Sequence, residues 1–368
     1  MQEMTNLFRR IGITDDEVES RIQSCFHQMF FDQTERLWHD VDADSACIVD
    51  TGNMDARTEG MSYGMMMCVQ MDRQDLFDKL WQFSMRYMHQ GAGKYQGYFA
   101  WSVALDGRHH AEGPAPDGEE YFAMALFMAA ARWGSGDGIF DYAAQAREIL
   151  RHCLHQPELV PGGHAMWDAE NHYIKFVPEA PYTDPSYHLP HFYELFARLA
   201  DLKDRPFWKQ AAQASRKYIV LSAHPVTGMS PEYAQFDGTP ILQFGKDYAY
   251  YSDAYRVALN IALDHLWFGA SPQMDAVVSR LQRWMNAHAD PHDYRAWDLD
   301  GTPHEEPAMH PVAITAVLAA ASAVTGDADC LYRFWHTPLR TGKRRYYDNC
   351  LYFFALLLLA GKYRMWVM

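Results

Sequence analysis

The sequence predicts an all-α protein in which six buried inner helices are ringed by six outer helices. Apolar residues recur with a helical period nearly throughout, and strand-like alternation is rare. Apolar helical segments that begin just behind an acidic or polar loop alternate with charged, amphipathic segments, at a period of very roughly 60 residues until a shorter last unit. The order of helix types repeats along the chain, although the sequence itself does not. This alternation predicts an (α/α)6 barrel.

The outer helices are expected to be amphipathic, with one apolar face against the inner ring and one charged face in water. The first of them is predicted over residues 16–38. The others are predicted over residues 74–90, 138–155, 205–222, 272–288 and 327–336.

The inner helices are apolar on nearly every side, as the Met-Met-Met-Cys-Val run at 65–69 illustrates. A helix with that pattern needs a buried environment all round. The inner helices are predicted to open near Glu59, Asp117, Asp184, Asp253, Met309 and Tyr346.

Long irregular segments separate the predicted helices. Loops of this length inside a compact domain are generally functional, and short β-hairpins are compatible with them. The segments cover residues 91–117, 157–185, 224–251 and 290–310. They hold the aromatic residues Tyr95, Tyr98, Phe99, Trp101, Trp167, Tyr173, Tyr182, Tyr248, Tyr250, Tyr251, Tyr294 and Trp297.

Composition bounds the class of protein. A chain of 368 residues that is 49% hydrophobic can bury one large core, and no Gly/Ser-rich or charged linker favours two domains over a single domain spanning 1–368.

The net charge of -15 repels nucleic acid and anionic membranes. The longest apolar run, 351–361, is shorter than the roughly 20 residues that span a bilayer. The first residues lack a signal-peptide pattern, so we expect a cytoplasmic protein, and we expect a monomer.

No metal or cofactor site is predicted. The six cysteines show no C-x-x-C pairing, and we interpret them as free thiols. His188 and His191, followed by Glu194, are the best candidates for a metal site, but a proline interrupts their helical spacing and no further ligand set is apparent.

Three acidic residues open inner helices in similar surroundings, namely Glu59, Asp117 and Asp253. In the barrel they would point into one cleft. Two carboxyl groups in an aromatic cleft are what the cleavage of a glycosidic bond requires, and Tyr and Trp rings suit stacking on sugars. The alternative is that all three cap helix N-termini, which explains any one of them more easily than all three.

Glu59 and Asp253 are expected to differ in pKa. Burial of Glu59 against an apolar helix raises its pKa, so that it holds a proton near neutrality. Arg256, one turn after Asp253, lowers the pKa of that carboxyl group. Arg57 lies close to Glu59 in sequence and would weaken the first effect if it pointed at the carboxylate.

Three segments carry a resemblance to a known family. Residues 57–64 (RTEGMSYG), 115–125 (APDGEEYFAMA) and 252–256 (SDAYR) resemble the catalytic blocks of glycoside hydrolase family 8, and the likeness extends from about residue 45 to the end. The sequence departs from the family at Pro116, where serine or threonine is usual. One branch shares this departure, and residues 174–178, 184–194 and 310–311 resemble it as well. The resemblance to that branch implies an exo-acting enzyme that releases xylose from the reducing end of xylo-oligosaccharides.

The resemblance implies roles for the three acidic residues. Glu59 matches the general acid of the family, and Asp253 matches the general base that deprotonates water for attack with inversion. Asp117 matches a third carboxylate that binds the sugar in the central subsite. Inversion requires the Glu59 and Asp253 carboxyl groups to lie roughly 6.5 to 9.5 Å apart.

The resemblance also implies substrate-binding residues. Arg256 matches an arginine that keeps the base ionised, Tyr187 a tyrosine near the attacking water, and Trp101 an aromatic platform. His310 and Pro311 match a kink that closes one side of the cleft, so that one sugar fits beyond the cut. Among the other loop aromatics we expect substrate contacts from Trp167 and Tyr251.

Other functions remain as alternatives. An endo-acting xylanase or a glucanase of the same family would have an open cleft. A sugar epimerase or isomerase on the same toroidal fold would use histidines as acid and base, for which the chain offers His188, His191 and His310. A non-catalytic oligosaccharide-binding protein would need the aromatics without the acid and base pair.

Overall fold

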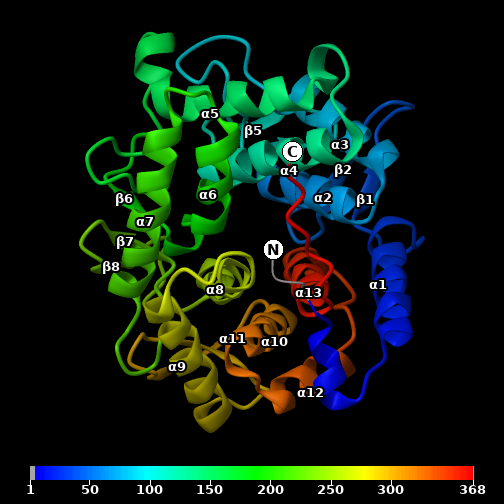
Figure 1. Cartoon of the computed structure of the whole chain (residues 1–368), viewed down its shortest axis with the longest axis vertical. Coiled ribbons are helices and arrows are strands. Elements are labelled where there is room, and N and C mark those ends of the chain that lie inside the picture. The colour runs from blue at the N-terminus through cyan, green and yellow to red at the C-terminus, as the bar shows by residue number, and fades with distance from the viewer. Residues whose placement is uncertain (1–4, 368) are drawn as a thin grey trace.

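The computed structural model describes residues 5–367, and six apolar helices in this range form a closed ring. In chain order each contacts the next, and the last contacts the first (Figure 1). Most residues of these helices are buried, as their sequences predict. The inner helices are α2 (Thr58–Gln70), α4 (Pro116–Trp133), α6 (Pro190–Leu199), α8 (Arg256–Trp267), α10 (Pro311–Ala320) and α13 (Arg345–Leu359).

Six more helices of the described range surround this ring, and each packs against one inner helix. Figure 1 shows α5, α7, α9, α12 and α1 at the periphery. The pairs are α3 on α2, α5 on α4, α7 on α6, α9 on α8, α12 on α10 and α1 on α13. The prediction of a mostly helical chain is confirmed. The outer helices are α1 (Asp15–Phe30), α3 (Gln74–Phe83), α5 (Tyr142–Leu159), α7 (Arg205–Ser222), α9 (Pro272–His288) and α12 (Ala328–His336).

The first outer helix is shorter than predicted. It begins with a capping box between Thr14 and Glu17 and ends at Phe30, eight residues before the predicted end. Asp32 is the reason, because its carboxylate accepts the backbone N–H groups of Thr34 and Glu35, both at 2.8 Å. This turn directs the chain away from the helix axis.

Short antiparallel strands precede the inner helices. β3 runs directly into α2, and its Asp55 pairs with Ala104 of β4. The hairpins in the long loops agree with the sequence, whereas the strands before α2 were not expected. The sheet β1–β5 consists of Trp38–Asp40, Ala46–Asp50, Asp55–Arg57, Ser102–Ala104 and His109–Ala111. The other strands are β6 (Tyr182–Thr183), β7 (Tyr233–Gln235), β8 (Pro240–Ile241), β9 (Arg295–Trp297) and β10 (Pro303–Pro307).

Short helical turns complete the fold. Two of them lead into inner helices: η4 precedes α6, and η5 runs directly into α8. The turns are η1 (Leu7–Ile11), η2 (Ser84–Met88), η3 (Gly138–Phe140), η4 (Pro185–Tyr187), η5 (Ser252–Tyr255) and α11 (Ser322–Thr325).

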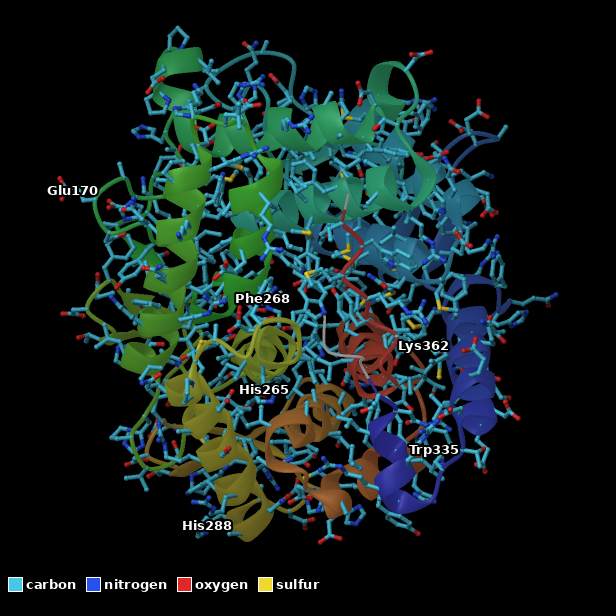
Figure 2. All side chains as sticks on the ribbon, in the orientation of Figure 1. Glu170, His265, Phe268, His288, Trp335 and Lys362 are labelled. Atoms are coloured by element: carbon cyan, nitrogen blue, oxygen red, sulfur yellow. The ribbon has the colours of Figure 1, made fainter. Side chains whose placement is uncertain are left out.

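Segments from the two halves of the sequence meet around α1 and α12. Trp335 of α12 packs on Phe8 of η1 with ring centroids 5.1 Å apart, and Lys362 forms an ion pair with Glu19 of α1 at 3.2 Å (Figure 2). The six cysteines are buried free thiols, as predicted. No helix in the part of the chain that the structure describes is both long and apolar enough to cross a membrane.

Candidate active site

Glu59 lies in the first turn of α2, where β3 passes directly into the helix. Its Oε1 accepts a hydrogen bond from the Tyr346 hydroxyl at 2.7 Å, and its Oε2 accepts one from Arg256 Nη1 at 3.0 Å. Burial raises the pKa of Glu59 to about 7, and repulsion from Asp117 and Asp253 adds to this against the opposing effect of Arg256 and Tyr346. The carboxyl group therefore holds a proton close to neutrality.

Two glycines bring the neighbouring helices close to Glu59. A Cβ atom at Gly60 would lie 2.7 Å from the Tyr346 hydroxyl, so glycine leaves the path by which that hydroxyl reaches Glu59. A Cβ atom at Gly118 would lie 2.4 Å from the Thr58 side chain. Glycine at this position allows α4 to approach α2, which brings Asp117 beside Glu59.

One guanidinium group joins the acidic residues. Arg256 Nη1 donates to Asp117 Oδ2 at 2.9 Å as well as to Glu59, while Nη2 lies 3.5 Å from Asp184 Oδ2 and 3.6 Å from Asp253 Oδ1. Arg256 thus reaches Asp253, as the sequence predicts, but its shorter contacts are with Glu59 and Asp117. The reason is that Arg256 is buried at the start of α8, where its side chain meets residues from α2 and α4.

Burial raises the pKa of Asp117 and, more strongly, that of Asp184, whose side chain is fully enclosed. Arg256 opposes the increase in both cases. A single positive charge therefore stabilises a cluster of four carboxyl groups, and the proton distribution within the cluster depends on it.

Arg57 forms its ion pairs with carboxylates other than Glu59. Its Nε lies 3.2 Å from Asp50 Oδ2 and 3.1 Å from Asp55 Oδ1, and its guanidinium stacks 5.2 Å from the centre of the Trp101 ring. The carboxylates of β2 and β3 thus hold Arg57 and, through it, the indole of Trp101. The raised pKa of Glu59 is not cancelled by a direct ion pair with this arginine.

A cleft of about 460 Å³ opens on one side of Glu59 and Asp253. Trp101, with 36% of its surface exposed, and Tyr187 lie in its lining, where the sequence places them. Half of the remaining lining residues are apolar or aromatic, and the other half are polar or charged. Aromatic rings beside polar groups suit the binding of sugar rings. The lining consists of Arg57, Thr58, Glu59, Trp101, Pro114, Ala115, Asp117, Phe176, Val177, Tyr187, Tyr233, Phe244, Asp253 and Arg256.

A second, much smaller recess of about 130 Å³ is lined by the same two carboxyl groups. His310 lies in its wall and is anchored to α13, because its Nδ1 is 3.1 Å from Asp348 Oδ2. The wall also contains Asp50, Gly52, Asn53, Arg57, Ser252, Met309, Arg344, Tyr346 and Tyr347.

Two predicted substrate-binding residues lie elsewhere. Trp167 is 2% exposed and packs in the core, 5.0 Å from Trp208 between ring centroids. Tyr251 is also 2% exposed, packs 4.8 Å from Tyr248 and lies outside the linings of both spaces. In this structure neither ring lines the cleft, because both aromatics pack against other parts of the protein and attach their loops to it.

The sequence analysis missed several residues of the site. Phe176, Tyr233 and Phe244 line the cleft, and Tyr346 contacts the carboxylate of Glu59. Phe176 lies within the segment 174–178 that carries the family resemblance, so a signal was present. Tyr346 was assigned only as the start of an inner helix, and nothing in its sequence context indicates that it reaches Glu59.

Two of the three histidines considered for acid and base chemistry, His188 and His191, are buried and lie outside the linings of the cleft and the recess, whereas His310 lies in the wall of the recess. His188 lies between Thr183 Oγ1 at 3.1 Å and Ser215 Oγ at 2.8 Å, and His191 packs on Trp267 with ring centroids 5.6 Å apart. Burial lowers the pKa of both histidines to about 3. A neutral, enclosed imidazole cannot serve as an acid and base in this cleft.

The site therefore contains the carboxyl group of Glu59, which holds a proton, and that of Asp253, whose side chain is 26% exposed. Aromatic residues line the cleft beside both groups. This combination suits general acid and base chemistry on a sugar chain.

Several known proteins are similar to this chain in both sequence and structure. The chain is 53% identical to the reducing-end xylose-releasing exo-oligoxylanase Rex8A of Paenibacillus barcinonensis, over 98% of this chain and 96% of that protein. It is 49% identical to the reducing end xylose-releasing exo-oligoxylanase of Halalkalibacterium halodurans, over 99% and 95%. The solved structure of Rex8A complexed with xylose superimposes with a TM-score of 0.97, at 51% identity, and covers 100% of this chain and 98% of that one. Residues 40–361 match the model of glycosyl hydrolases family 8, and the chain belongs to this family.

Proposed function

We propose that the protein is an inverting glycoside hydrolase that releases xylose from the reducing end of β-1,4-xylo-oligosaccharides, on an (α/α)6 barrel formed by its two rings of helices. The observation that carries the proposal is the inequality of the two spaces beside Glu59 and Asp253, about 460 Å³ and 130 Å³. The cleft has more than three times the volume of the recess, so we infer that several sugars bind in the cleft and a single sugar binds in the recess. Both relatives described above are reducing-end xylose-releasing exo-oligoxylanases, which supports this substrate and this mode of cleavage.

In the proposed reaction, the oligosaccharide lies in the cleft and its last xylose occupies the recess. Glu59 donates its proton to the glycosidic oxygen, so that xylose leaves as a neutral hydroxyl compound. Asp253 accepts a proton from a water molecule, whose oxygen forms the new bond to the anomeric carbon on the opposite face. Asp117 binds the sugar at the point of cleavage. We expect the Glu59 and Asp253 carboxyl groups to be separated by roughly 6.5 to 9.5 Å in a substrate complex.

The products from xylotriose and from polymeric xylan test this proposal. We expect xylose and xylobiose from xylotriose, while xylan remains almost uncut because the recess accepts one sugar. A ladder of oligosaccharides from xylan would instead indicate the endo-acting alternative. Conversion of a free sugar to its epimer without hydrolysis would indicate the isomerase alternative, which the buried positions of His188 and His191 disfavour.

His310→Ala is expected to change the product pattern. The substitution removes the imidazole from the wall of the recess together with its contact to Asp348, so a second sugar can extend beyond the cut. From xylotetraose the variant should release xylobiose in addition to xylose, as measured by chromatography of early products. His288→Ala, at an exposed outer position, is the control. Release of xylose alone by the His310 variant would mean that His310 does not limit the recess.

Tyr346→Phe is expected to move the alkaline limb of kcat/KM to higher pH. The Tyr346 hydroxyl lowers the pKa of Glu59, so removing it raises that pKa above about 7. Glu59 must be protonated to act, so activity is present below this pKa and is lost as pH rises through it. The measurement is kcat/KM on xylotriose as a function of pH. Tyr352→Phe, on the same helix, is the matched control, because the Tyr352 hydroxyl donates to the Thr337 carbonyl, and the alkaline limb of this variant should stay in place. A limb shifted to lower pH in the Tyr346 variant contradicts the assignment of Glu59 as the acid.

A further inference from the structure

Phe244 projects into the cleft from an exposed segment that follows β8. Its ring contacts that of Tyr233 with centroids 5.6 Å apart, yet 70% of the residue remains exposed. Its backbone has a φ of 57°, and Gly245 follows with a φ of 74°. A phenylalanine adopts this left-handed conformation at a cost, and it persists where the surroundings hold it.

Lys246 provides that restraint from two residues further along the chain. Its Nζ donates to Glu232 Oε2 at 2.6 Å, and its ammonium group lies 4.9 Å from the centre of the Tyr251 ring. The Glu232 side chain is 4% exposed, whereas that of Lys246 is 22% exposed. Removing the cationic partner of a buried carboxylate is strongly destabilising, because it leaves an uncompensated charge. Lys246 is therefore held in place more firmly than a surface lysine.

Glu232 lies next to the reacting groups. It immediately precedes Tyr233 in the cleft wall, and its Oε1 has no hydrogen-bond partner among the described residues. Burial raises the pKa of Glu232 to about 7, and repulsion from Asp253 adds to this, while Lys246 lowers it. The Glu232 carboxylate thus pairs with the segment that carries Phe244, and Glu232 precedes the cleft residue Tyr233 in the chain.

We propose that Lys246 and Glu232 are positioning residues that hold the ring of Phe244 against the sugar chain in the cleft. This inference rests on the proposed function for the identity of the sugar. The ion pair fixes the segment at one point, and a hydrogen bond of 3.1 Å from the Tyr182 hydroxyl to Gln243 Oε1 fixes it at a second. Phe244 then acts on substrate binding, and Lys246 acts through Phe244.

A double-mutant cycle on Phe244→Ala and Lys246→Met tests the inference. Each variant should raise KM for xylotetraose roughly fivefold, the effect of losing one aromatic contact, with kcat changed less than about twofold. The double variant should be no worse than Phe244→Ala, because both substitutions remove the same interaction. Lys246→Arg, which keeps the charge, should restore most of the affinity. Lys209→Met, at an exposed position on α7, is the matched control for loss of a lysine. Effects that add in the double variant would overturn the proposal.

A crystal structure of the Lys246→Met variant gives a readout that does not depend on activity. We expect the ring of Phe244 to leave its position beside Tyr233. If it keeps that position, the ion pair does not hold it and the inference fails. If the unaltered enzyme released no xylose, the proposed function would fail, while the position of Phe244 in the variant would still decide the positioning role.

Discussion

Replacing Glu59 with glutamine is expected to lower kcat on xylotriose by about three orders of magnitude, within the range that general acid catalysis contributes. The amide has the shape of the carboxyl group but cannot transfer a proton to the glycosidic oxygen. Because the side chain faces the cleft rather than the core, with 16% of its surface exposed, the variant should fold normally. Steady-state kinetics together with thermal unfolding measures both effects.

A substrate whose leaving group needs no protonation distinguishes the loss of the general acid from general damage to the site. Fluoride departs without protonation, so Glu59→Gln should hydrolyse β-xylobiosyl fluoride at a rate close to that of the unaltered enzyme. Asp253→Asn should remain impaired on the fluoride, because water must still be deprotonated. If the Glu59 variant lost activity equally on both substrates, Glu59 would not be the proton donor.

Replacing Arg256 with methionine is expected to lower the free energy of unfolding by about 3 to 5 kcal/mol, the usual result of leaving buried charges without their partner. The guanidinium is 5% exposed and contacts Glu59, Asp117, Asp184 and Asp253. We also expect a loss of activity of at least about a hundredfold, since the positions and protonation of the acid and the central carboxylate both change.

The pH dependence of this loss provides the check. Without Arg256 the pKa values of Glu59 and Asp117, which the arginine lowers, rise further. Protonation then relieves the repulsion at low pH, so the loss of stability should be greater at about pH 8 than at about pH 5. Denaturant unfolding at the two pH values measures this loss in the free energy of unfolding. Arg256→Lys is the matched control, because lysine keeps the positive charge but lacks the several N–H donors of the guanidinium. Equal losses at both pH values would contradict the electrostatic explanation.

The helical plan was predictable from the sequence. The outer helices α7 and α9 have the predicted bounds, because their amphipathic patterns begin and end sharply. The end of α1 was not predictable from periodicity, because the turn at Asp32 depends on side-chain hydrogen bonds. The strands before α2 are three to five residues long, too short to show alternation.

The acidic centre of the site was predictable, and much of its aromatic lining was not. Glu59, Asp117 and Asp253 each open a helical element after a polar loop, and this position is visible in the sequence. Whether a loop aromatic faces the cleft depends on how the loop folds back. Trp167 therefore lies in the core, while Phe244 lines the cleft.

The contacts of Arg256 were also predictable only in part. The spacing of three residues from Asp253 was visible in the sequence, but the contacts with Glu59 and Asp117 join residues that are 197 and 139 positions away in the chain. Local sequence carries no information about such contacts. They follow from the ring of inner helices, which brings α2, α4 and α8 to one centre.

The most direct test of the proposed mechanism is real-time proton NMR of xylotriose hydrolysis by the purified enzyme. The new reducing end of xylobiose should appear first as the α-anomer, because water attacks opposite the β-linked xylose that leaves. Slow mutarotation should then produce the β-anomer. Initial appearance of the β-anomer would show retention of configuration, which requires a nucleophilic carboxylate near 5 Å from the acid and contradicts the role of Asp253 as a base.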